Sequence, residues 1–144
     1  MRHLRFGLVG PALLCSAVAL AGCASAPASV EPPRPGASPE EVVAVLIDVV
    51  NARDTDALPT VATPDQARTI EQSWFGTAIV EADVDAARPV DHALTGGNES
   101  VYVHVDVVLD DTDGSLPEGE LVGWGYTLVR QDDGRWLVSE QGVG

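Results

Sequence analysis

Three side chains capable of acid–base chemistry alternate along one segment of the sequence. Tyr102, His104 and Asp106 are each two residues apart, and valines occupy the positions between them. Residues at this spacing project from the same side of a β-strand, about 7 Å apart for each pair. An imidazole next to a phenol and a carboxylate can act as a general base with a hydrogen-bond donor beside it. His104 is therefore the candidate base of a catalytic set, with Tyr102 as the donor.

The other side of the same segment supports a different interpretation. It carries only aliphatic side chains, namely Val101, Val103, Val105 and Val107. Such a face is the more natural choice for the core, which would leave the three polar side chains in solvent or at a contact between subunits. We therefore expect a non-catalytic protein first and keep the enzyme as the alternative.

No metal or cofactor is expected from the motifs. After the N-terminal segment the only histidines are His92 and His104, which lack the spacing of a ligand pair such as H-x-x-x-H. The stretch Asp111-Thr112-Asp113-Gly114, with Glu120 after it, has part of the spacing of a calcium loop, but Leu109 stands where the first ligand belongs. A solvated acidic turn is the expected structure. The sequence also has no Gly-rich phosphate loop and no G-x-S-x-G motif.

Aromatic side chains are the remaining candidates for ligand contact. Trp74 and Phe75 adjoin each other near the expected end of a helix, where such a pair more often belongs to the core. Trp124 and Tyr126 lie on one face of an expected strand. Trp74, Trp124 and Tyr126 are therefore the candidates for the lining of an apolar pocket.

The N-terminal segment predicts export from the cytoplasm. Met1 to Arg5 is basic, and Phe6 to Ala21 is uncharged and apolar, which is typical of a secretory signal. The segment ends in Leu20-Ala21-Gly22-Cys23, which resembles the lipobox of bacterial lipoproteins. The resemblance implies that residues 1–22 are a signal peptide and that the Cys23 thiol carries diacylglycerol. The alternative is an ordinary signal peptide cleaved near Ala24-Ser25-Ala26.

Cysteine usage and charge narrow the possible partners. Cys15 would leave with the signal peptide, so lipidated Cys23 would be the last cysteine and no disulfide would form. The formal net charge is −14 and the sequence contains no lysine. These properties argue against binding to nucleic acid and against docking on anionic lipid through charge. The expected location is the extracytoplasmic face of the cell membrane, with the lipid as anchor.

The rest of the sequence predicts a linker and one domain. Residues 23–38 are rich in Pro, Ala and Ser, which predicts a non-helical stalk of roughly 45 Å if it is extended like polyproline II. Residues 39–144 are long enough for a single domain with a modest core. Ser38-Pro39-Glu40-Glu41 has the pattern of a capping box, and Thr63-Pro64-Asp65-Gln66 repeats it. We therefore expect helices after both, with a short turn or helix around Pro59 between them.

Strands are expected from Thr77 onward because the apolar period changes to two. Ala78, Val80, Ala82 and Val84 would share the buried face of the first strand. Further strands are expected over 86–94, with an edge or bulge at Pro89, and over 101–108, 121–130 and 135–141. Gly123 and Gly125 predict a bend or a close backbone approach. Helices followed by antiparallel strands give the class α+β, with N-terminal helices packed on a curved antiparallel sheet of four to six strands.

Two stretches extend this pattern to a family. The helix end that runs from Asn51 to Leu58 and the last hairpin, Asp132 to Val138, resemble the nuclear transport factor two-like superfamily, which has a cone-shaped, cystatin-like fold. The resemblance implies a possible pocket but no particular reaction, since members include isomerases, cyclases and non-catalytic lipoproteins. We therefore expect an envelope lipoprotein that binds a protein or a small apolar ligand. The alternatives are an isomerase-like or cyclase-like enzyme using Tyr102, His104 and Asp106, and an accessory subunit that forms a homodimer through the exposed sheet face.

Overall fold

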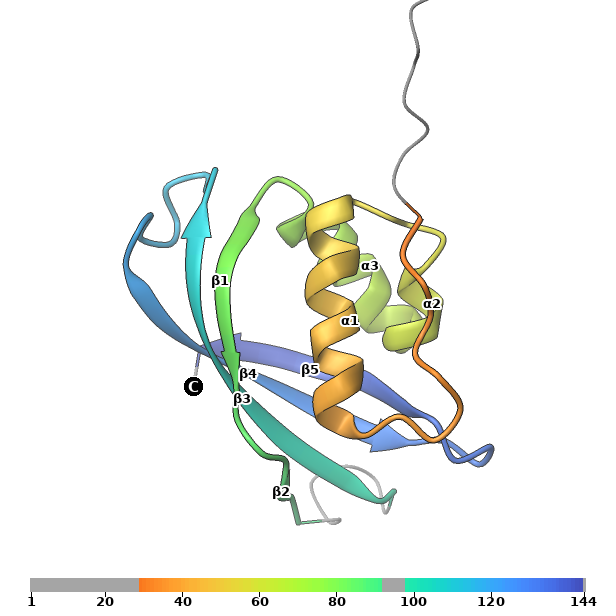
Figure 1. The fold of residues 1–144 in the computed structure, drawn as a ribbon. Helices are drawn as coiled ribbons and strands as arrows, with labels where there is room; N and C mark the ends of the chain where they lie inside the picture. The colour runs from red at the N-terminus through yellow and green to blue at the C-terminus, as the bar shows by residue number, and fades with distance from the viewer. Residues whose placement is uncertain (1–28, 92–97, 144) are drawn as a thin grey trace, which may run out of the picture.

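The computed structural model describes residues 29–91 and 98–143 (Figure 1). Three helices precede an open antiparallel sheet of five strands, so the predicted α+β class is confirmed. The elements are α1 (Pro39–Ala52), α2 (Leu58–Val61), α3 (Pro64–Trp74), β1 (Ala78–Val84), β2 (Arg88–Pro89), β3 (Ser100–Asp110), β4 (Leu121–Arg130) and β5 (Trp136–Val143). The predicted signal peptide, Cys23 and His92 lie outside the described residues.

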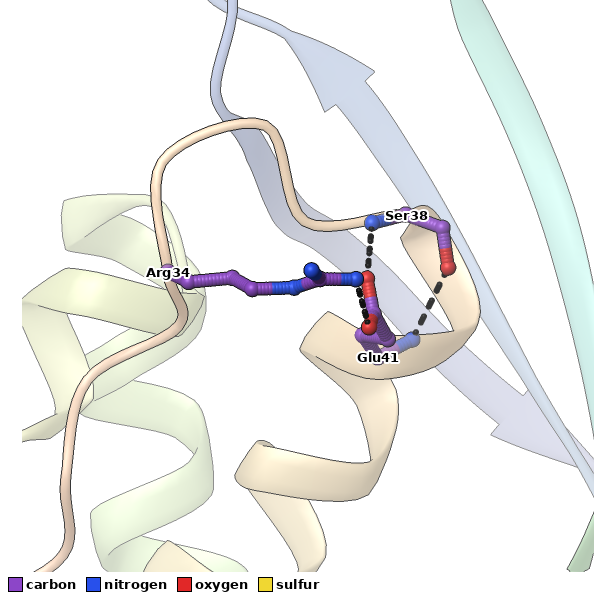
Figure 2. A network of polar contacts seen from close by, with 3 residues as sticks. All are labelled: Arg34, Ser38 and Glu41. Atoms are coloured by element: carbon purple, nitrogen blue, oxygen red, sulfur yellow. Dashed lines mark hydrogen bonds and ion pairs between the residues drawn. The ribbon is translucent and has the colours of Figure 1, made fainter.

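The start of α1 forms as its sequence predicts. The Ser38 hydroxyl accepts a hydrogen bond from the Glu41 backbone N–H at 3.3 Å, and the Ser38 N–H donates to Glu41 Oε2 at 2.7 Å (Figure 2). The other oxygen of Glu41 lies 2.6 Å from Arg34 Nη2. The capping box therefore satisfies two backbone donors that a helix start leaves without partners.

The end of α1 fixes where the sheet begins. Arg53 ends the helix in the left-handed region with φ 55°. The Asn51 amide donates to the Ile79 carbonyl at 2.9 Å and accepts from the Ile79 N–H at 2.8 Å. This pair of bonds joins α1 to β1 through both backbone groups of one residue.

The predicted capping box of α3 does not form, although the helix begins at Pro64 as expected. The Thr63 side chain makes no capping bond, and its backbone N–H donates instead to the Val138 carbonyl of β5 at 2.9 Å. The Gln66 side chain is buried, and its Nε2 has no hydrogen-bond partner within residues 29–91 and 98–143. Tertiary contact with β5 therefore takes precedence over the local motif.

The sheet has the order β1-β3-β4-β5, and β2 pairs with β3 beyond the end of β1. The helices cover one face of this curved sheet, which we call the inner face (Figure 1). The core lies between them, and its fully buried sheet residues are Val103, Val105, Val107, Leu109, Tyr126, Leu128 and Val138. The valine row of the sequence therefore faces the helices, and Val101 at its end is half-buried.

The buried face predicted for β1 is wrong, because Val80 and Ala82 are exposed and Ala78 and Val84 are only half-buried. Ile79 is buried, whereas Val80, expected in the core, is 56% exposed. A bulge between Ile79 and Glu81 shifts the register against β3. Such a bulge interrupts the regular alternation of side chains between the two faces of the sheet. The hydrogen bonds with the Asn51 amide stabilise the Ile79 backbone at this point. The strand expected over 86–94 is the two-residue β2, and residues 92–97 lie outside the described structure.

Residues 29–37, which we call the strap, are the second half of the predicted linker. They have no helix or strand, but they lie along the domain beside α1 and α2 (Figure 1). The Val30 N–H donates to Asp54 Oδ2 at 2.9 Å, and Ala37 is buried. Within the described ranges, no helix combines the length and apolar character needed to cross a membrane.

Candidate functional site

Two indole rings meet at one end of the molecule. Trp74 lies in the last turn of α3, and Trp124 lies on the inner face of β4, where it pairs with Val105 and Val143. The ring centroids are 4.9 Å apart and the ring planes are inclined by 73°, an edge-to-face contact. Trp74 is nearly buried, and Trp124 is half-buried.

The two indoles line a recess of about 230 Å³. Its apolar lining is completed by Leu116 and by Val143, which is 72% exposed. Its polar lining comes from the hydroxyls of Ser73, Thr77, Thr112 and Ser115 and from the carboxylate of Asp113. The residues come from the end of α3, the β3–β4 loop and the neighbouring ends of β4 and β5. The recess is thus an apolar hollow with a polar rim, an arrangement typical of small-molecule sites.

Trp124 contributes an unused hydrogen-bond donor to this region. Its indole Nε1 is buried and has no partner among the described residues. Leaving such a donor unpaired costs about 1–3 kcal/mol relative to a satisfied one. An acceptor on a bound molecule that reached this N–H would offset part of that cost.

Tyr126, the third predicted pocket residue, lies in the core and does not line the recess. Its side chain is 2% exposed, and burial raises the pKa of its hydroxyl far above the usual value. The hydroxyl is therefore protonated at every physiological pH. The structure brings Trp74 and Trp124 together and leaves Tyr126 beneath them as a packing residue.

The β3–β4 loop is held by its own carboxylates. Glu118 Oε1 accepts from the Thr112 N–H at 2.9 Å, and Asp113 Oδ1 accepts from the Ser115 N–H at the same distance. Hydrogen bonds from the Ser115 side chain and backbone hold the pKa of Asp113 below its usual value. The carboxylate at the rim is therefore ionised at neutral pH. Within the described chain no group of three or more His, Cys, Asp or Glu residues is arranged to hold a metal ion, and the loop resembling a calcium site is no exception.

The predicted catalytic set lies on the opposite face of the sheet, which we call the outer face. His104 Nε2 and Asp106 Oδ1 are 3.2 Å apart, with side chains that are 25% and 46% exposed. Tyr102 is also half-buried, and the Arg88 guanidinium stands 5.3 Å from the centre of its ring. The structure thus pairs His104 with Asp106, while Tyr102 contacts an arginine of β2.

Glycines explain why these side chains lie flat on the sheet. A Cβ atom on Gly125 would stand 2.2 Å from Tyr102 Oη, and one on Gly123 would stand 2.9 Å from His104 Cε1. The sequence predicted a bend or a close backbone approach at the two glycines, whereas the structure places the aromatic side chains of Tyr102 and His104 over them. None of Tyr102, His104 and Asp106 lines the recess.

The sequence missed several residues of the recess. No sequence pattern marks Thr77, Leu116 or Val143 as a lining residue, because each comes to line the recess only when distant segments meet in the fold. The strap also borders two other hollows, of about 120 and 460 Å³, over α1 and the β4–β5 hairpin. The chain matches no protein-family model and no curated protein sequence.

Proposed function

We propose that the protein is a non-catalytic envelope lipoprotein, anchored through Cys23, that binds a small apolar ligand in the recess lined by Trp74 and Trp124. The observation that carries the binding function is the recess itself. Two indoles from distant segments line it, and the rim is polar. A ligand with a flat apolar body would gain the burial that this surface lacks in the free protein.

The fold supports this proposal without determining it. An α+β domain with helices over one face of a curved antiparallel sheet is compatible with the nuclear transport factor two-like superfamily. Folds of this kind host many unrelated activities, so the site rather than the architecture must carry the function. Membership in that superfamily is therefore part of the proposal.

Ligand binding can be tested with N-phenyl-1-naphthylamine, a neutral apolar dye whose fluorescence rises in apolar surroundings. The full mature chain without its lipid is expected to enhance the dye's emission. Thr77→Phe, which fills the recess, should abolish the enhancement, and Thr127→Phe on the outer face is the matched control. Equal enhancement by both variants would place the dye elsewhere and contradict the proposal.

The anchor has its own test. Cys23→Ser removes the thiol that lipid attachment requires, so the variant should lose the mass of the diacylglyceryl group on its N-terminal peptide. The protein should then leave the membrane fraction. Membrane retention equal to that of the unchanged protein would contradict lipid anchoring through Cys23.

A homodimer through the outer face is the second candidate role. Leu121 is 69% exposed and lies opposite Val108 on that face, so an apolar pair is presented to solvent. Light scattering on the mature chain at 10 to 100 micromolar, roughly the range in which weak dimers form, would detect it. Leu121→Glu should abolish any dimer, and a monomer at every concentration would remove this role.

A further inference from the structure

We propose that the recess takes a small organic cation, meaning a protonated amine or a quaternary ammonium group carried on an apolar body. This inference rests on the proposed function of the recess and adds the charge of its ligand. It follows from the electrostatics of the rim and from the chemistry of the two indoles.

Among the described residues, the rim carries negative charge without a compensating cation. Asp113 is the only charged residue of this part of the chain that lines the recess. The sequence from Ser100 to Val129 contains no arginine or lysine, yet it includes Asp110, Asp111, Glu118 and Glu120 around the same loop. The bonds described for Asp113 and Glu118 come from neutral donors, which orient the carboxylates but leave their charge in place.

The arginines of the described chain lie elsewhere, and each except Arg53, which caps α1 through its backbone N–H, has an acidic or aromatic side chain as partner. Four of them form ion pairs, which are Arg34 with Glu41, Arg68 with Asp65, Arg130 with Glu99 and Arg135 with Asp133. Arg88 stands over Tyr102, and Arg53 caps α1. None of these residues lines the recess, so a cation there would have to come with the ligand.

The walls of the recess suit a cation better than an anion. The face of an indole ring attracts a positive charge through its quadrupole, and Trp is the best of the aromatic residues for this contact. Trp124 is half-buried beside the recess, so part of its ring is available to a ligand. Asp113 stays ionised at neutral pH because hydrogen bonds from Ser115 lower its pKa. An anionic ligand would meet an uncompensated carboxylate, and a neutral one would gain nothing from it.

The test compares two ligands of equal shape, choline and its neutral carbon analogue 3,3-dimethylbutan-1-ol. Binding to the full mature chain without its lipid is followed through the indole N–H signals of Trp74, Trp124 and Trp136. Trp136 at the start of β5 lines a different hollow and serves as the internal reference. Choline is expected to shift the Trp74 and Trp124 signals and to bind about tenfold more tightly than the analogue, which corresponds to about 1.4 kcal/mol.

Asp113→Asn should reduce the preference for choline to threefold or less. Asp133→Asn is the matched control, because Asp133 accepts a backbone N–H two residues ahead in the same way but lies at the β4–β5 hairpin. Equal binding of the two probes would overturn the cation inference and leave the apolar ligand of the proposed function intact. Failure of choline to shift either recess signal would also overturn it, whereas the dye experiment decides the proposed function separately.

Discussion

The recess and the outer face both contain residues that the sequence predicts as candidate site residues, but the two sets are positioned in different ways. On the outer face, Tyr102, His104 and Asp106 come from a single strand and lie over glycines of its neighbour. At the recess, Trp74 and Trp124 come from segments fifty residues apart, and the β3–β4 loop closes one side. Spacing along one strand gives proximity without enclosure, whereas enclosure needs segments that meet only in the folded chain. Substitutions in the two regions measure how large this difference is.

Replacing an indole of the recess should have the largest effect. Trp74→Ala removes a nearly buried ring and its contact with Trp124, and is expected to lower the free energy of unfolding by about 3–5 kcal/mol. Tyr102→Ala on the outer face should cost less than half as much, because its ring is half-buried. Urea unfolding followed by circular dichroism measures both. If the two variants lost the same unfolding free energy, the recess would be no more tightly packed than the outer face.

A substitution on the outer face tests the packing of Tyr102 over glycine. Gly125→Ala puts a Cβ within 2.2 Å of Tyr102 Oη and should lower the free energy of unfolding by about 1–3 kcal/mol. Gly142→Ala is the control, since it lies opposite Gly125 on β5 and its added Cβ meets nothing within 4 Å. In a Tyr102→Ala background the cost of Gly125→Ala should largely disappear. If Gly125→Ala still lowered the free energy of unfolding in that background, the requirement for glycine would not come from the Tyr102 side chain.

Glu40, which lies outside both regions, should make the free energy of unfolding depend on pH. The Ala87 N–H donates to Glu40 Oε1 at 2.7 Å, and this bond lowers the pKa of Glu40 from its ordinary value. The pKa of Glu40 is lower in the folded protein than in the unfolded chain. The bond therefore contributes fully to folding stability above the unfolded pKa, and this contribution is lost as the pH falls through the folded pKa. Glu40→Gln should cost less than about 1 kcal/mol at pH 7 and flatten the acid branch of the stability curve. Glu71→Gln, exposed on α3, is the control, and an identical acid branch in both variants would contradict the assignment.

The smallest effect is expected from the contact between His104 and Asp106 on the outer face. Asp106→Asn removes the charge beside His104, and partly exposed pairs of this kind contribute less than about 1 kcal/mol. Choline binding at the recess should be unchanged, because neither residue lines it. A loss of more than 2 kcal/mol would show that the pair is organised more tightly than a surface contact. That outcome would revive the enzyme alternative.

Local signals predicted the parts of the fold that depend on neighbours in sequence. The α1 capping box, the proline at the start of α3 and the valine row of β3 follow from motifs a few residues long. The outer face could be anticipated as well, since its residues share one strand. The α3 cap and the register of β1 could not, because Val138 and Asn51 reach them from distant segments. The sequence named Trp74 and Trp124 as candidates, but their meeting with Leu116 and Val143 requires the whole sheet.

The docked strap changes how far the domain can stand from a membrane. Only six bonds of the Cα trace separate Cys23 from Ser29, and a chain spans at most about 3.6 Å per residue, so a lipid on Cys23 would hold Ser29 within roughly 20 Å of its attachment point. Val30 is bonded to Asp54 just past the end of α1, and Asn51 joins that same end to the start of β1, two residues beyond Thr77 of the recess. With the proposed lipid on Cys23, this short tether would keep the side of the domain where α1 ends and β1 begins close to the bilayer. A ligand of the proposed recess could then be taken up from the lipid surface.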